Sequence, residues 1–162
     1  RTMKIRIPDK KPVMMGRTLE GTIFEVVFLV LALVLWGFIS WLIARAPSLV
    51  PIHFDIVGEA DKWSHPTSVI FPCLIMTVAG ACMLLGAYFP KSVNLPVKVE
   101  NARQVALVMR MMRILSLVML LITLLIALST LLASRLFWLV WVAVGLLLAI
   151  VATYTILIYK AR

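Results

Sequence analysis

Four side chains that could ligate a metal ion fall within one short stretch of the chain: His53, Asp55, Asp61 and His65. Imidazole nitrogens and carboxylate oxygens are common metal ligands in proteins. In an extended segment His53 and Asp55 would face the same side, because strand side chains alternate with a period of two. Gly58 could then turn the chain and bring Asp61 back toward them. Since the spacing matches no common metal motif, we predict neither a metal site nor a cofactor here.

The same residues have a structural interpretation, which we prefer. Asp55 or Asp61 could accept hydrogen bonds from backbone N–H groups, as acidic residues do in turns, and His53 could bond a carbonyl. Trp63 is suited to the interface between bilayer and water, and Pro66 is typical of the first position of a helix. We therefore expect a shaped loop over residues 47–63.

Catalytic signatures are lacking in the sequence. It shows no paired nucleophile and base, no phosphate-binding glycine loop and no metalloprotease helix motif. Cys73 and Cys82 are nine residues apart in one apolar run, about 13 Å along a helix axis, so they cannot bridge within that helix. We predict that both are small packing residues and that the protein is not an enzyme. A metal-dependent membrane enzyme built on the loop His and Asp residues is the alternative.

Composition points to a membrane protein. Of the 162 residues, 63% are hydrophobic and 14% are charged, whereas soluble domains are roughly half apolar and a quarter charged. A helix needs about 20 apolar residues to cross a bilayer. We predict an all-α integral membrane protein with a basic tail (1–21), a single membrane domain (22–162) and four transmembrane helices, over residues 22–44, 67–89, 114–133 and 136–159.

Basic residues predict the orientation of these helices. Thirteen of the 16 lysines and arginines fall in the tail, between the second and third apolar runs, or at the C-terminal end. The other side receives Arg45, Lys62 and Arg135. Because lysine and arginine concentrate in cytoplasmic segments, we expect both termini in the cytoplasm and the loop 47–63 outside. Topology and attraction to anionic lipid explain the net charge of +9, so we expect no nucleic-acid partner.

Three arginines share one stripe of the segment that approaches the third apolar run. At 100° per residue, Arg103, Arg110 and Arg113 lie on one side of a helix, with methionine and valine largely on the other. We predict that these arginines contact anionic lipid. A docking surface for a cytoplasmic protein is the alternative.

Two features inside the apolar runs bear on packing. Glu25 is an acidic residue near the start of the first run, and we expect it to pair with Arg17 or Arg113 rather than to relay protons. In the second run, two pairs of small residues have a spacing of four: Thr77 with Ala81, and Cys82 with Gly86. Such spacing permits close helix packing.

Residues 47–63 read Pro-x-x-Val-Pro-Ile-His-Phe-Asp-x-x-Gly-x-x-Asp-x-Trp. This pattern resembles the signature of a small multi-spanning domain of unknown function at the N-terminus of SdpI-type bacterial proteins. These are immunity factors against the sporulation-delaying-protein toxin. The resemblance covers residues 27–89 and continues at Asn101, Gln104 and the basic approach to the third apolar run.

The resemblance implies a bacterial inner-membrane protein of the toxin-immunity or peptide-sensing type. Some members of that family also pass a signal to a cytoplasmic repressor. The implied partners are membrane lipids and an extracellular peptide or protein, and the alternative is a structural or accessory subunit of a larger membrane complex. The residues expected to bind the outer ligand are Pro51, His53, Phe54, Asp55, Gly58, Asp61 and Trp63.

Overall fold

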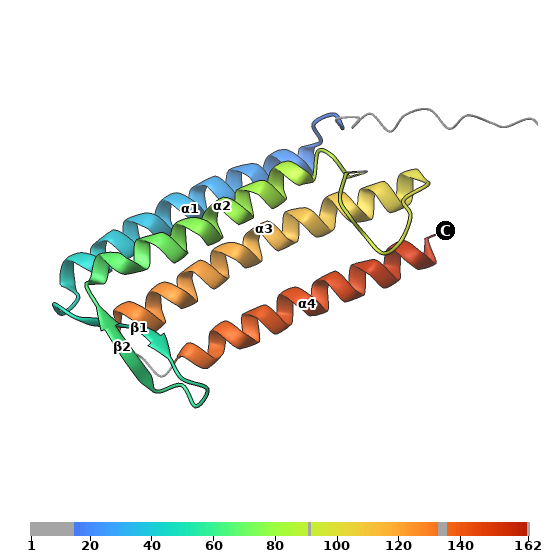
Figure 1. Cartoon of the computed structure of the whole chain (residues 1–162). Coiled ribbons are helices and arrows are strands. Elements are labelled where there is room, and N and C mark those ends of the chain that lie inside the picture. Colours follow the sequence, from blue (N-terminus) through green and yellow to red (C-terminus); the bar gives the residue numbers. More distant parts are fainter. Residues whose placement is uncertain (1–14, 91, 133–135, 162) are drawn as a thin grey trace, which may run out of the picture.

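The computed structural model describes residues 15–90, 92–132 and 136–161, which form a bundle of long helices (Figure 1). The helices are α1 (Leu19–Arg45), α2 (Ile70–Gly86), α3 (Ala102–Leu131) and α4 (Phe137–Lys160). Together with the 3₁₀ turn η1 (Pro66–Val69) before α2, they provide four segments long and apolar enough to cross a membrane. The predicted all-α membrane fold is confirmed.

Local sequence explains where the helices begin and end. The Thr18 hydroxyl accepts a hydrogen bond from the backbone N–H of Gly21 and caps α1. Pro66 is the first residue of η1, as expected, and His65 caps it. The third helix starts at Ala102, well before the predicted residue 114, because Asn101 and Gln104 form a reciprocal capping box. The basic approach segment and the third apolar run are therefore one continuous helix.

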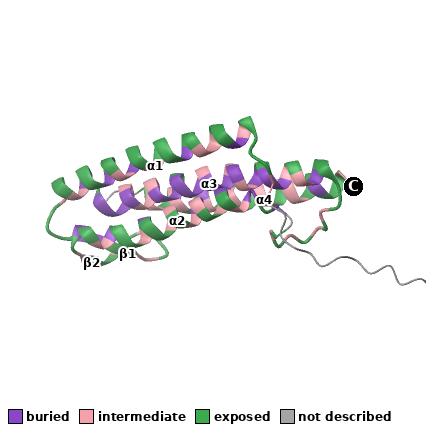
Figure 2. Cartoon of the chain, turned by 90° about the horizontal axis from the view of Figure 1, so that it is seen from above, coloured by how far each residue is buried: buried purple, intermediate pink, exposed green. Residues whose placement is uncertain are grey.

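Helix α3 is the centre of the bundle. Sixteen of its thirty residues are buried, whereas α4 buries two. Figure 2 shows most of the buried colour on α3 and mostly exposed colour on α1. The other three helices each pack against α3, so their remaining apolar surface faces outward, where a bilayer would cover it.

A close contact between helices lies at Gly80 of α2. A Cβ atom at this position would lie 3.1 Å from the Met119 Cβ atom, the Phe28 ring and the Ser116 carbonyl oxygen. Gly80 therefore lets α2 approach α3 closely and leaves room for the Phe28 ring of α1. The small residue singled out from spacing, Gly86, instead faces the end of the Met112 side chain.

Two short strands, β1 (Val50–Phe54) and β2 (Ala60–Ser64), form an antiparallel hairpin between α1 and α2. Figure 1 places this hairpin at one end of the bundle, beside the start of α4. We call this the hairpin end. Val50 and Pro51 are buried and fasten the base of β1 against the bundle. The described chain starts at residue 15 and stops at residue 161 at the opposite end, which we call the terminal end.

Candidate functional site

The turn of the hairpin is built by Asp55 and Gly58. The Asp55 carboxylate accepts hydrogen bonds from the backbone N–H groups of Val57 (3.0 Å) and Glu59 (2.8 Å). Gly58 has a φ of 85°, a left-handed conformation that residues with a Cβ atom rarely adopt. The turn expected at Gly58 is therefore present, and Asp55 has the turn-forming role that we preferred.

A cross-strand pair joins the two strands next to this turn. The Nδ1 atom of His53 lies 2.5 Å from a carboxylate oxygen of Asp61, and both side chains are about half exposed. His65 lies apart from this pair, because its ring accepts a hydrogen bond from the Thr67 backbone N–H at the start of η1. Within the described residues, no group of three or more metal-ligating side chains is close enough to hold an ion.

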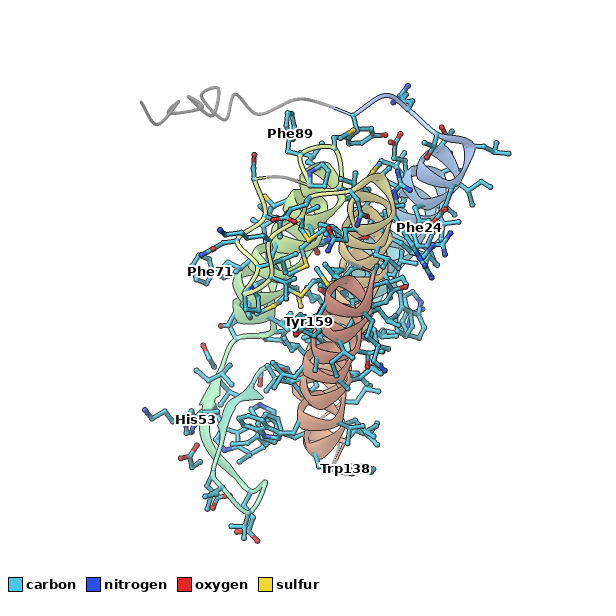
Figure 3. All side chains as sticks on the ribbon, turned by 90° about the vertical axis from the view of Figure 1, so that its right-hand side faces the viewer. Phe24, His53, Phe71, Phe89, Trp138 and Tyr159 are labelled. Carbon is cyan, nitrogen blue, oxygen red and sulfur yellow. The ribbon has the colours of Figure 1, made fainter. Side chains whose placement is uncertain are left out.

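A cavity of about 530 Å³ lies between the hairpin and the start of α4. Its aromatic walls touch across the two elements: the Phe54 ring stacks on Phe137 with centroids 4.6 Å apart, and Phe137 meets Trp141 edge-on at 6.5 Å. Figure 3 shows the aromatic rings between the hairpin and the first turns of α4, where Trp138 is labelled. The lining residues are Pro51, Phe54, Ile56, Val57, Gly58, Glu59, Ala60, Trp63, Phe137, Trp138 and Trp141.

Only some of the residues expected to bind the outer ligand line this cavity. Pro51, Phe54, Gly58 and Trp63 line it, whereas His53, Asp55 and Asp61 do not. The motif residues outside the cavity shape the hairpin that forms one wall. Their contacts therefore fix the position of that wall.

The sequence did not predict that α4 contributes a wall of the cavity. Phe137, Trp138 and Trp141 belong to the last helix, more than seventy residues after the hairpin. The available signal was the dense aromatic start of that helix, since three of its first five residues are aromatic. We had no reason from the sequence to place this helix start beside the hairpin.

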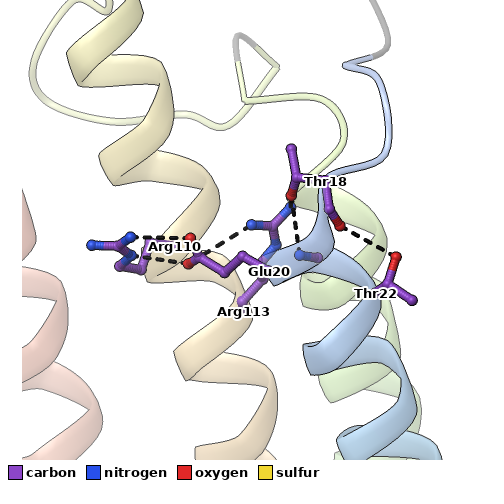
Figure 4. A network of polar contacts seen from close by, with 6 residues as sticks. Thr18, Glu20, Thr22, Arg110 and Arg113 are labelled. Carbon is purple, nitrogen blue, oxygen red and sulfur yellow. Dashed lines mark hydrogen bonds and ion pairs between the residues drawn. The ribbon is translucent and has the colours of Figure 1, made fainter.

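A second polar cluster, at the terminal end, joins α1 to α3 (Figure 4). Arg110 donates two hydrogen bonds to the Glu20 carboxylate, at 2.9 and 3.0 Å. The side chain of Arg113 is only 4% exposed, lies against Gly21 and donates to the Thr18 hydroxyl at 3.3 Å. A Cβ atom on Gly21 would come within 2.6 Å of the Arg113 guanidinium, so glycine makes room for this buried cation.

This geometry corrects the expected lipid contact at one of the three arginines, Arg113. Arg103 is exposed, but Arg110 pairs with an acid of α1 and Arg113 is enclosed by protein. The reason is that α3 packs against α1, so the part of the stripe at Arg110 and Arg113 meets the start of α1. Arg113 is thus an internal contact, whereas Arg103 and Arg110 remain exposed.

Further contacts fasten the terminal end. Glu25 pairs with Arg17 at 3.1 Å, as expected, and also accepts a hydrogen bond from the Tyr88 hydroxyl. Gln104 is fully buried, accepts from the backbone N–H groups of residues 100 and 101, and donates to the Ile158 carbonyl at 2.9 Å. These bonds join α1 to the segment that follows α2, and α3 to α4.

Comparison with known proteins gives one family match. Residues 28–77 match the model of a domain of unknown function (DUF1648), a domain associated with SdpI-like proteins. The match runs from α1 through the hairpin into α2, so it includes one wall of the cavity and leaves the α4 wall outside. No curated protein matches the chain, and no solved structure matches it.

Proposed function

We propose that this chain is a bacterial inner-membrane protein of the toxin-immunity or peptide-sensing type, whose hairpin end faces outward and binds an extracellular peptide. The cavity between the hairpin and α4 carries this proposal. Its volume lies within the range of about 300–1,000 Å³ that is usual for ligand sites. The proposed role is recognition, and it includes no catalytic step and no cofactor.

The exposure of the aromatic walls supports a binding role. Trp63, Trp138 and Trp141 are each more than half exposed, although they are large apolar side chains. Tryptophan contributes much of the binding energy in protein interfaces, because it covers a large area with few rotatable bonds. A peptide entering the cavity would bury these rings.

The distribution of basic residues supports the outward orientation. Both ends of the described chain lie at the terminal end. The described basic residues at that end are Arg17, Lys98, Arg103, Arg110, Arg113 and Lys160, whereas Arg45 and Lys62 belong to the hairpin end. With that end in the cytoplasm, the chain satisfies the positive-inside rule and the hairpin reaches the external medium.

Thiol labelling tests this orientation. Glu59→Cys places a thiol at the exposed turn, and Cys82→Ser in the same chain removes an exposed native thiol. We expect a membrane-impermeant maleimide to label the variant in intact spheroplasts. Cys82→Ser alone is the control and should stay unlabelled. Labelling that requires lysis would reverse the proposed topology.

Cell survival and peptide capture test the function. The purified chain is incubated with a secreted peptide fraction, and cells expressing it are exposed to the same fraction. We expect Trp138→Leu with Trp141→Leu to abolish both capture and protection, because the change removes two walls of the cavity. Trp41→Leu is the matched control, since Trp41 is exposed on α1 and does not line the cavity. Full protection by the double variant would refute the proposal.

An accessory subunit is the second candidate, and the exposed face of α4 favours it. Gly145 lies on that face, and a Cβ atom added to it would meet no other atom within 4 Å, so a neighbouring helix could approach closely. Ala81 and Gly86 are poor probes of this idea, because Ala81 packs against the core and Gly86 contacts Met112. Loss of a co-purifying membrane protein in Gly145→Leu, with peptide protection absent from the native chain, would favour the accessory role.

A further inference from the structure

The cavity at the hairpin end combines aromatic rings with one ionisable side chain. Its five rings come from both walls, and the acid is Glu59 at the hairpin turn. The face of an aromatic ring carries negative potential, so rings gathered around a cavity attract cations, and tryptophan does so most strongly. The rings are Phe54, Trp63, Phe137, Trp138 and Trp141.

Glu59 differs from the other two acids of the hairpin. The Asp55 carboxylate is occupied by two backbone N–H groups, and Asp61 pairs with His53. Among the described residues, the Glu59 carboxylate has no hydrogen-bond or ion-pair partner. It is the one acidic side chain of the hairpin that lines the cavity.

We infer that this cavity binds a basic side chain, arginine or lysine, of the incoming peptide, with the cation over the aromatic rings and against Glu59. This inference rests on the proposed function, because it names the chemistry by which the peptide would be recognised. A neutral apolar ligand would take water away from the Glu59 carboxylate without replacing its hydrogen bonds, which is unfavourable. A cation supplies those hydrogen bonds and an opposite charge.

The chain contains one contact of this kind already. In the last turn of α1, at the hairpin end, the guanidinium carbon of Arg45 lies 4.3 Å from the centroid of the Trp41 ring. Arginine suits such a place because its planar guanidinium stacks on aromatic faces while its N–H groups bond a carboxylate. We therefore expect arginine to bind more tightly than lysine.

Two probes with blocked termini separate the effect of charge from that of shape. The full chain in detergent micelles is titrated with N-acetyl-arginine amide and with N-acetyl-citrulline amide, which has nearly the same shape and no charge. Tryptophan fluorescence reports binding, because three of the five tryptophans, Trp63, Trp138 and Trp141, line the cavity. We expect a saturable change with the arginine probe, at a Kd at least tenfold lower than for citrulline.

Glu59→Gln is the decisive variant, since it removes the charge and keeps the size of the side chain. We expect it to weaken arginine binding at least fivefold and to leave citrulline binding unchanged. Glu100→Gln is the control for overall charge, because Glu100 is an exposed acid next to α3, far along the chain from the cavity. The control should bind both probes as the native chain does.

The outcomes separate this inference from the proposed function. Equal binding of the two probes, or unchanged discrimination in Glu59→Gln, would overturn the inference, and peptide capture would still stand on its own. Choline binding more tightly than the arginine probe would also overturn it, by assigning the cavity to a lipid headgroup. Arginine-specific binding that depends on Glu59 supports the inference even where no secreted peptide is captured, and the proposed function would then fail alone.

Discussion

The two ends of the bundle use polar and aromatic residues in opposite ways. At the terminal end Arg113 and Gln104 are buried, and each has protein partners. At the hairpin end three tryptophans are exposed around a cavity, and the Glu59 carboxylate has no partner among the described residues. A buried polar group without a partner costs free energy, so the buried polar groups of the terminal end need partners within the protein itself. At the hairpin end, the exposed rings and the Glu59 carboxylate are available to bind a ligand.

This contrast assigns different consequences to mutations at the two ends. Changes at the terminal end remove partners inside the protein, so they should lower the free energy of unfolding. Changes at the hairpin end remove surface that has few internal contacts, so they should alter binding with little effect on the bundle.

The largest effect is expected for Gln104→Leu. This change leaves the N–H groups of residues 100 and 101 and the Ile158 carbonyl without their partner. We expect a loss on the order of 3 kcal/mol in the free energy of unfolding, measured by detergent-induced unfolding with circular dichroism. Arg103→Gln, at an exposed neighbouring position, should cost less than about 0.5 kcal/mol. Equal stability of the two variants would contradict the role given to Gln104.

Gly80→Leu should have the next largest effect. The added side chain meets the Met119 Cβ atom and the Ser116 carbonyl oxygen, which are fixed to the α3 backbone, and it also meets the Phe28 ring. Overpacking of this kind costs about 1–3 kcal/mol. Gly145→Leu is the matched control, since its site is open and leucine favours a helix over glycine by up to about 1 kcal/mol. The same measurement should give a higher free energy of unfolding for Gly145→Leu than for the native chain, and a lower one for Gly80→Leu.

Gly58→Val should disturb the hairpin and spare the bundle. Valine at a φ of 85° is strained by about 1–2 kcal/mol, which the short hairpin must absorb. We expect faster proteolysis at residues 55–60 and a shift in tryptophan emission, with the helical unfolding transition unchanged. Gly58→Asn should behave nearly as the native chain, because asparagine tolerates the left-handed conformation. Identical proteolysis of the valine and asparagine variants would show that the turn does not need this conformation.

The smallest effect on stability is expected for the pair of His53 and Asp61. Both side chains are about half exposed, and exposed ion pairs contribute about 0–1 kcal/mol. Asp61→Asn should therefore lower the unfolding free energy by less than about 1 kcal/mol. A double-mutant cycle with His53→Gln measures the coupling between the two side chains. A loss as large as that of Gly80→Leu would show that the hairpin is as tightly integrated as the terminal end.

Local chemistry could be predicted from the sequence. The four apolar runs indicated the membrane helices, Gly58 with Asp55 indicated the turn, and Pro66 indicated the helix start that follows. Each of these features depends on residues within a few positions of one another or on the average polarity of one segment. Helix capping, turn conformation and transfer into lipid act at that range.

Tertiary structure decided which surfaces are inside. Arg113 was expected to face lipid and is buried against Gly21. Gly86, where close packing was expected, meets only the end of the Met112 side chain, whereas Gly80 meets the backbone of α3. The start of α4 lies beside the hairpin and completes the cavity. Helical periodicity shows which residues share a face, but it does not show which neighbour covers that face, because every helix here is apolar over most of its length. That choice follows from the fit of side chains between segments far apart in the chain.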